Sequence, residues 1–275
     1  MRIVVNGLDI GQTNPYIITG FKSSVIGAMK LNTYEIPQTS AVKFVSNYGK
    51  GITMEFEMSI LANTHEQLLT YIRTLENALY PKANTALDIV MYTDNNDVYR
   101  IQGYLATDID YTRQVTYAKL SFTILVPNGK ILGNTLNSIT LSQTGAPTGA
   151  VLPWTLPVLL GAPTGGAIIN NAGNGYASLN ITISGPGTNF AIYNNVTNEK
   201  IEINNLTLNN LQTIEIDGTA QTVKQSNVSI YQFVSFDSTF LTLAPGNNTL
   251  SFYVNTGATS STQAVITWYN TYVGI

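Results

Sequence analysis

The stretch that decides the fold is Gly51–Pro81, GITMEFEMSILANTHEQLLTYIRTLENALYP, because a strand pattern changes into a helix pattern within it. From Ile52 to Ile60, apolar and polar residues alternate, which is the period of a strand with one buried face. The later apolar residues recur at steps of four and three, as on one face of a helix: Leu68, Ile72, Leu75 and Leu79. We therefore predict a strand that runs into an amphipathic helix over residues 64–79.

Both ends of the predicted helix carry residues that commonly start and stop one. At the start, Asn63 with Glu66, or Thr64 with Gln67, can form a capping box that satisfies N–H groups of the first turn. At the end, Pro81 lacks an N–H and disfavours helical angles in the residue before it. A single helix in a β-rich chain usually covers one face or one open end of a sheet, so we expect it to close the core of an N-terminal domain.

The remainder of the N-terminal half has the patterns of strands and turns. RIVVNGLDI at Arg2–Ile10 predicts a hairpin with Asn6-Gly7 at its turn. Asp94–Asp97 and Asp110–Arg113 are interpreted as hairpin turns because both separate strand patterns. Further strands are predicted at Tyr16–Phe21, Ala86–Tyr92, Val98–Ala106 and Val115–Val126.

Between Lys22 and Tyr48 the pattern is weak, and we expect a long excursion there rather than a regular sheet. Segments of this length in a compact domain are usually functional or disordered, so a partner-binding arm and an ordinary surface loop both stay open. The candidate assembly contacts in this segment are Tyr34, Phe44 and Tyr48.

The middle of the chain, Lys130–Gly175, is rich in Gly, Pro, Thr and Asn, which marks a domain boundary. Trp154 lies between two prolines there and is a further candidate assembly contact, because tryptophan is enriched in binding hot spots. A chain of 275 residues is long enough for two domains. We predict an N-terminal domain, a linker and a C-terminal domain at residues 1–130, 131–167 and 168–275.

From Ala177 onward, short strand patterns return at regular spacing with turn residues between them. They include SIYQFV at Ser229–Val234 and a hairpin with Asp217-Gly218 at its turn. Trp268 alternates with Ile266 and is predicted to lie in the core. The predicted fold class is mainly β: an N-terminal β-sandwich or split-barrel domain with one helix, and a C-terminal antiparallel β-sandwich or jelly roll.

The composition argues against several classes of function. The net charge is -3 and no Lys/Arg cluster occurs, so the chain lacks the electrostatic footprint of a nucleic-acid-binding protein. The absence of cysteine excludes disulfides, zinc-thiolate sites and thiol catalysis. With no secretory signal and no apolar run near 20 residues, we expect synthesis in a cytosol and no membrane span.

The candidates for chemistry are weak. His65 is the single histidine and falls in the first turn of the predicted helix, which favours a solvated surface residue. Asp94–Asp97 lacks the spacing of a calcium loop, and no G-x-S-x-G motif occurs. We therefore expect no enzyme activity and no catalytic, metal-binding or cofactor-binding residues. A hydrolase in which two acidic side chains converge in space, as in a glycosidase, stays open as a weaker hypothesis.

The C-terminal half carries an ordered set of short motifs: Ser184-Gly185, Asn189–Asn194 (NFAIYN), Thr197–Ile201 (TNEKI), Ile216-Asp217, Leu243–Asn248 (LAPGNN) and Val265–Tyr269 (VITWY). This set resembles the C-terminal domain of siphovirus distal tail proteins, over about Ile168–Ile275. The N-terminal half resembles that family more loosely, through the order of hairpin, excursion, strand and helix.

The resemblance implies a structural distal tail protein of a long-tailed phage. Its N-terminal domain would form a ring of six copies that continues the tail tube, and its galectin-like C-terminal sandwich would attach the baseplate and host-adsorption apparatus. The implied partners are further copies, the tail tube protein, tail hub, tape-measure or tail-associated proteins, and receptor-binding proteins, with no nucleic acid. The implied location is the tail tip of the virion, after synthesis in the cytoplasm of a bacterial host, and the Lys22–Tyr48 excursion would close the ring.

A carbohydrate-binding baseplate or tail-fibre component is the alternative. In that reading the C-terminal sandwich recognises sugars of the host cell surface. The resemblance weakens it, because some relatives carry inserted carbohydrate-binding modules and this chain has no room for one.

Overall fold

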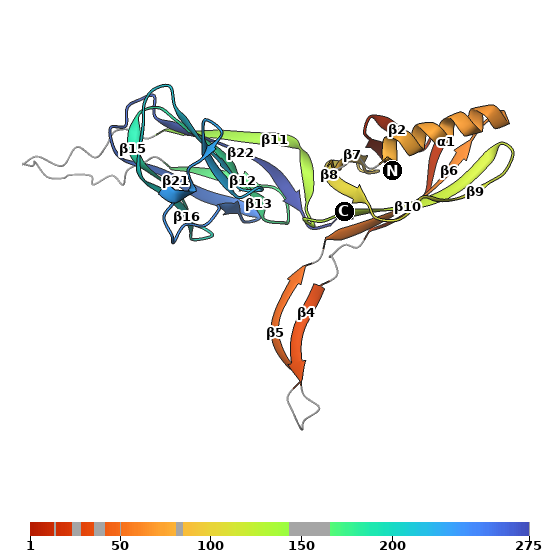
Figure 1. Ribbon diagram of the computed structural model, residues 1–275, viewed down its shortest axis with the longest axis horizontal. Helices are drawn as coiled ribbons and strands as arrows, with labels where there is room; N and C mark the ends of the chain where they lie inside the picture. Colours follow the sequence, from red (N-terminus) through yellow and green to blue (C-terminus); the bar gives the residue numbers. More distant parts are fainter. Residues whose placement is uncertain are drawn as a thin grey trace, which may run out of the picture. The chain divides into compact units, whose positions relative to one another are not determined.

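The computed structural model describes residues 1–13, 15–23, 29–35, 42–49, 51–80, 85–142 and 166–274, drawn in Figure 1. The chain forms two compact units, Met1–Asn134 with Tyr272–Ile275, and Thr135–Thr271. Both consist mainly of antiparallel strands, and the one α-helix of the described residues belongs to the first unit. The predicted mainly β fold with one helix is confirmed.

The first unit is a nearly closed barrel. Its strands pair in the order β2-β1-β7-β8-β10-β6-β3, all antiparallel. A bridge between Gly11 and Ile17 links the two ends of this series. The Asn6-Gly7 turn joins β1 to β2 as predicted, with φ of 48° and 88°. The elements are β1 (Arg2–Val5), β2 (Leu8–Ile10), β3 (Tyr16–Ser23), β4 (Met29–Glu35), β5 (Val42–Gly49), β6 (Ile52–Leu61), α1 (His65–Leu79), β7 (Leu87–Tyr92), β8 (Val98–Leu105), β9 (Asp110–Arg113) and β10 (Tyr117–Val126).

Helix α1 forms where the sequence predicts it and fills the core of this unit. Its buried residues are the four predicted ones, Leu68, Ile72, Leu75 and Leu79. Of the two predicted caps the structure selects Thr64, whose hydroxyl oxygen accepts a 3.3 Å hydrogen bond from the Gln67 N–H. At the other end, the Asn6 side-chain amide donates to the Ala78 carbonyl oxygen at 2.9 Å, so a turn residue satisfies a carbonyl of the last helical turn.

The excursion between Lys22 and Tyr48 is more regular than predicted. Strands β4 and β5 form a two-stranded antiparallel sheet of their own, with an irregularity after Asn32. The expectation that no regular sheet forms here is therefore wrong. Pairing between two neighbouring strands supplies the order that the weak apolar periodicity does not reveal.

A second correction concerns Asp110–Arg113, which is strand β9 rather than a hairpin turn. It pairs with Ala118–Ser121 of β10 and is exposed along its whole length. Because both of its faces are wet, the sequence shows no alternation there. The turn follows at residues 114–116, where the Gln114 N–H donates to the Tyr117 carbonyl oxygen. The other predicted turn, at Asp94–Asp97, is confirmed between β7 and β8.

Part of the predicted linker is strand. Residues 131–142 form β11, which passes from the first unit into the second, while residues 143–165 lie outside the described part of the chain. The second unit contains β11 (Ile131–Ser142), β12 (Gly166–Asn171), β13 (Ala177–Ser178), β14 (Asn180–Ser184), β15 (Gly187–Asn194), β16 (Glu199–Leu208), β17 (Thr213–Asp217), β18 (Thr222–Gln225), β19 (Val228–Ser229), the 3-10 turn η1 (Tyr231–Phe233), β20 (Thr242–Leu243), β21 (Gly246–Thr256) and β22 (Gln263–Tyr272).

Two sheets enclose the core of the second unit, in the orders β19-β18-β17-β14-β22-β11 and β12-β21-β15-β16. Trp268 lies in this core as predicted, with 7% of its surface exposed. The predicted strand at Ser229–Val234 is wrong, because η1 replaces most of it. The hairpin at Asp217 forms, and its carboxylate accepts hydrogen bonds from the N–H groups of Thr219 and Ala220, both at 2.8 Å.

Candidate assembly surfaces

Three of the four candidate assembly residues lie on the β4–β5 hairpin. Tyr34 is in β4, opposite Lys43, and Phe44 and Tyr48 are in β5. The structure thus brings these three into one supersecondary element. Trp154 lies outside the described residues.

Strands β3 and β9 present backbone edges that no other described strand covers. Beyond the bridge at Ile17, β3 pairs only with β6, and β9 pairs only with β10. The Gln114 N–H donates to Tyr117, and hydrogen-bonded pairs alternate in an antiparallel ladder. The N–H groups of Tyr111 and Arg113 therefore point away from β10, toward the open edge. Such an edge is a template for pairing with another chain.

The sheet face that lies opposite the core of the first unit is polar. The Lys22 ammonium lies 3.5 Å from a carboxylate oxygen of Glu55 and 3.7 Å from one of Glu57. A shallow pocket of about 230 Å³ opens beside this cluster, lined by Glu55, Glu57, Asp110, Thr112, Lys119, Leu120 and Ser121. The face suits contact with water, and its charges of both signs are interspersed.

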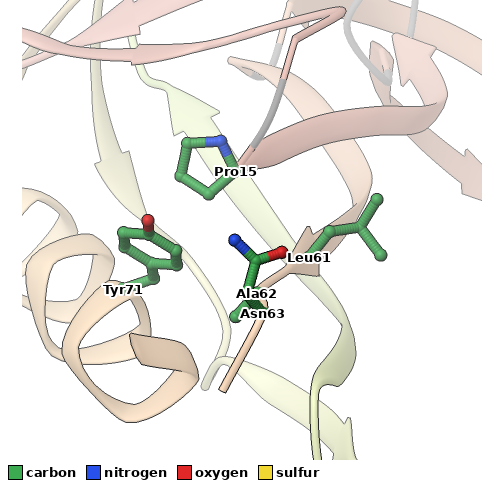
Figure 2. Close-up of a pocket in the computed structure, with 5 residues that line it drawn as sticks. All are labelled: Pro15, Leu61, Ala62, Asn63 and Tyr71. Carbon is green, nitrogen blue, oxygen red and sulfur yellow. The ribbon is translucent and has the colours of Figure 1, made fainter. Parts of the chain in front are cut away.

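A second pocket, of about 350 Å³, lies between the end of β6 and helix α1 (Figure 2). It is lined by Pro15, Leu61, Ala62, Asn63 and Tyr71. Figure 2 shows the Asn63 side chain between those of Tyr71 and Leu61, with Pro15 above it in this view. An amide and a phenol are the polar side chains of this lining, which suits binding of a small side chain better than acid–base catalysis.

His65 behaves as a surface residue. It is exposed at the first turn of α1, with its Nδ1 atom 3.1 Å from the carbonyl oxygen of Val115. Within the described residues, no cluster of three or more His, Cys, Asp or Glu side chains could hold a metal ion. In the same part of the chain, no helix has the length and apolar character needed to cross a bilayer.

In the part of the second unit that the structure describes, one aromatic side chain is completely exposed. Phe236 has a relative exposure of 106% and follows Ser235 in a tight turn, in which the Ser238 N–H donates to the Ser235 carbonyl oxygen at 3.0 Å. Both ends of this turn are bonded to β16. The Ser235 N–H donates to the Glu202 carbonyl oxygen at 2.9 Å, and the Thr239 N–H donates to that of Lys200 at 2.7 Å.

Side chains fix the same turn. Asp237 accepts a 2.6 Å hydrogen bond from the Ser235 hydroxyl and forms a 2.6 Å ion pair with Lys200. These two contacts lower the pKa of Asp237 to about 2. Sequence reasoning missed this turn, because its bonds go to a strand more than 30 residues earlier and its sequence, SFDS, has no specific signature.

A polar network extends from the turn across the neighbouring sheet. Lys200 also lies 3.3 Å from the carboxylate of Glu202, which accepts a 2.6 Å hydrogen bond from the Tyr193 hydroxyl. That bond, together with burial, raises the pKa of Tyr193 to about 12. The Tyr193 ring packs edge-on against Tyr253, with centroids 5.4 Å apart. Asp237, Lys200, Glu202, Tyr193 and Tyr253 are thus connected, and we call these residues, together with Phe236 next to Asp237 in the chain, the aromatic patch.

Buried asparagines explain two of the sequence motifs. Asn248, in LAPGNN, is fully buried; its oxygen accepts from the Ala244 N–H at 3.0 Å, and its nitrogen donates to the carbonyls of Ala244 and Gly246 at 2.7 and 3.0 Å. Asn194, in NFAIYN, donates to Asn248 at 3.2 Å and to the Thr242 carbonyl at 2.6 Å. These amides replace water for loop backbone groups inside the unit.

The comparisons with known proteins agree with this architecture. Residues 174–272 match the family model described as "Siphovirus-type tail component, C-terminal domain". The fold is shared with the crystal structure of the SPP1 Dit (gp 19.1) protein, described as a paradigm of the hub adsorption apparatus in phages that infect Gram-positive bacteria. That match has a TM-score of 0.69 and 11% sequence identity, and it covers 97% of each chain.

Two structures of the phage P2 baseplate in its activated conformation also match. The one with Ca has a TM-score of 0.46 and 10% identity and covers 98% of this chain and 97% of that chain. The one with Sr has a TM-score of 0.47 and 10% identity and covers 96% and 97%. No curated protein matches the sequence. Residues 174–272 are therefore similar to the C-terminal domain of siphovirus-type tail components, and nearly the whole chain shares its fold with the SPP1 Dit protein.

Proposed function

We propose that this tail component assembles into a closed ring of six copies at the tail tip, where it joins the tail tube to the baseplate and host-adsorption apparatus. The number six comes from the resemblance to distal tail proteins. The role is structural, without a catalytic step. The partners are the tail tube protein, the tail hub or tape-measure proteins, and receptor-binding proteins.

The observation that carries the ring proposal is the pair of open edges on the first unit. Successive neighbours in the series β3, β6, β10 and β9 are antiparallel, so β3 and β9 run in opposite directions. If the β9 edge of one copy meets the β3 edge of the next copy, the new pair is antiparallel as well. Repetition of this heterologous contact either closes into a ring or continues as a filament, and closure leaves no edge unpaired.

The offset between the two edges also fits a closed structure. Strand β9 lies level with Glu57–Ile60 of β6 through β10, whereas the uncovered part of β3, Gly20–Ser23, lies level with Met54–Glu57. The edges are therefore staggered along the strands. A sheet that closes into a barrel requires tilted strands with such a stagger.

In this arrangement the polar face with Lys22, Glu55 and Glu57 lines the opening, and helix α1 lies on the opposite side of the sheet. A solvent-exposed wall with charges of both signs suits an open channel better than a protein interface, which is depleted in charge at its centre. The β4–β5 hairpin, which pairs with no other described strand, is the ring-closing arm.

The test combines mass and shape. Six chains of 29.8 kDa would weigh about 179 kDa by light scattering, and negative-stain images of the same peak should show an annulus. A chain that stays at 29.8 kDa up to millimolar concentration would contradict self-assembly.

Two variants of Tyr111 test the contact between the β9 edge of one copy and the β3 edge of the next. Tyr111→Pro removes an N–H that points to the open edge and leaves the β9–β10 hydrogen bonds in place, since proline is tolerated on edge strands. Tyr111→Thr removes the same side chain but keeps the N–H. We expect rings from the threonine variant and monomers from the proline variant; rings from both would show that β9 is not the contact.

A further inference from the structure

We propose that Phe236 is the anchor through which the aromatic patch of the second unit binds another tail protein, one that offers an apolar pocket with a basic side chain at its rim. This inference rests on the proposed function and specifies one of its partner contacts. Phe236 would enter the pocket, and Asp237 and Lys200, to which the tyrosines are connected, would lie at its rim.

The turn that carries the exposed ring has a well-fixed backbone. The turn that carries Phe236 is fixed by two backbone bonds to β16, by the Ser238 bond inside the turn and by the two contacts of Asp237. None of these contacts involves the ring, which is completely exposed. The fold therefore holds the backbone of Phe236 in place without gaining burial from the ring, and a preordered backbone lowers the conformational entropy that is lost when the ring binds.

The residues connected to the Phe236 turn are polar and aromatic, as in a binding surface. Single exposed apolar residues are common and need no explanation. Phe236, however, is linked through Asp237, Lys200 and Glu202 to the packed rings of Tyr193 and Tyr253. Aromatic residues dominate binding hot spots, with polar groups that exclude water around them.

The net charge of the aromatic patch indicates which class of partner it can bind. Lys200 lies between Glu202 and Asp237, so the three groups sum to one negative charge, and Asp237 is 61% exposed. From residue 225 to the last residue the sequence contains no Lys or Arg. An anionic membrane surface is therefore disfavoured, and a basic group at the rim of the partner's pocket is favoured.

A protein is also favoured over a sugar. Recognition of a sugar needs free donors and acceptors beside a ring, but the Tyr193 hydroxyl and the Lys200 ammonium are engaged with carboxylates. The fully exposed ring itself has no polar atom. An apolar pocket satisfies it completely.

The experiment uses assembled particles of the phage that encodes this chain. The photo-cross-linking residue p-benzoylphenylalanine replaces Phe236 or, as a control, Leu211, which is 95% exposed in a turn where its N–H donates to Asn209. After irradiation, mass spectrometry identifies the cross-linked peptides. We expect residue 236 to reach apolar residues of one other tail protein and residue 211 to reach none of them.

The identified protein is then purified and its affinity for the full-length chain is measured. Phe236→Ser should weaken binding by about 10- to 100-fold, and Leu211→Ser should leave it unchanged. Cross-links from 236 only to copies of this chain, or equal affinities of the two variants, would overturn the inference. So would saturable binding of the full-length chain to a glycan array that Phe236→Ser abolishes, since the partner would then be a sugar.

Immunoblotting of purified tails for this chain shows whether a negative result refutes the Phe236 anchor or the proposed function. Tails that contain the chain but give no cross-link from 236 refute the anchor alone. Tails that lack the chain refute the proposed function.

Discussion

Replacing Asn248 by alanine should destabilise the second unit strongly, whereas the same change at its neighbour Asn247 should not. The Asn248 amide is fully buried and makes four hydrogen bonds, three of them to backbone groups of Ala244 and Gly246. Each contributes a net ~1 kcal/mol, and the partly buried Ala244 N–H left without a partner adds a desolvation penalty of about 1–3 kcal/mol. Allowing for relaxation, we expect a loss of about 3–5 kcal/mol in the free energy of unfolding.

Asn247 is the matched control. It is exposed and accepts one hydrogen bond, from Asn170 at 2.9 Å, so its replacement should cost less than about 1 kcal/mol. The assay is urea unfolding followed by the fluorescence of Trp268, which is buried in the same unit, in a Trp154→Phe background that removes the other tryptophan. Equal midpoints and slopes for the two alanine variants would refute the argument that buried asparagines hold these loops.

Three further predictions follow from the other unit and from the aromatic patch. Thr64→Ala removes the cap of helix α1 and should cost about 1 kcal/mol in urea unfolding, with Thr64→Ser close to wild type. Leu75→Ala opens a cavity beneath the same helix and should cost about 2–5 kcal/mol; a cost below 1 kcal/mol would mean that the helix is not packed on the barrel. The pKa of Asp237, measured by NMR titration of its carboxyl carbon, should be about 2 and should rise toward its ordinary value in Lys200→Ala. Because the folded pKa lies below the unfolded one, the stabilisation from these contacts is present above about pH 4 and is lost as the pH falls toward 2.

The features that the sequence predicts well are those whose signal is local. The buried face of α1 and the Asn6-Gly7 turn each depend on residues that are close together in the sequence, and both predictions are confirmed. The ordered set of motifs that includes LAPGNN indicates a domain similar to that of tail components, and the physical reason for LAPGNN, the burial of Asn248, becomes visible only when the loop is folded.

The features that sequence reasoning missed depend on distant partners. Strand β9 is exposed on both faces, so no apolar alternation marks it, and its order comes from β10. Strand β11 falls within the predicted linker because glycine and asparagine dilute its apolar pattern. The turn at Phe236 followed an apolar run that resembles a strand, and only its hydrogen bonds to β16 reveal it. That Tyr34, Phe44 and Tyr48 of the β4–β5 hairpin make assembly contacts stays a prediction. The same holds for Trp154, which lies outside the described residues.

The return of the chain to the first unit has a consequence for the timing of synthesis. Strand β22 ends in that unit at Tyr272, whose ring packs edge-on against Tyr99 with centroids 5.0 Å apart. A ribosome therefore releases the final piece of the first unit only after it has made all of the second, although domains usually fold in the order of their synthesis. A chain interrupted anywhere in the second unit lacks the Tyr272 contact of the first unit, so the first unit is completed only when the second has been made in full.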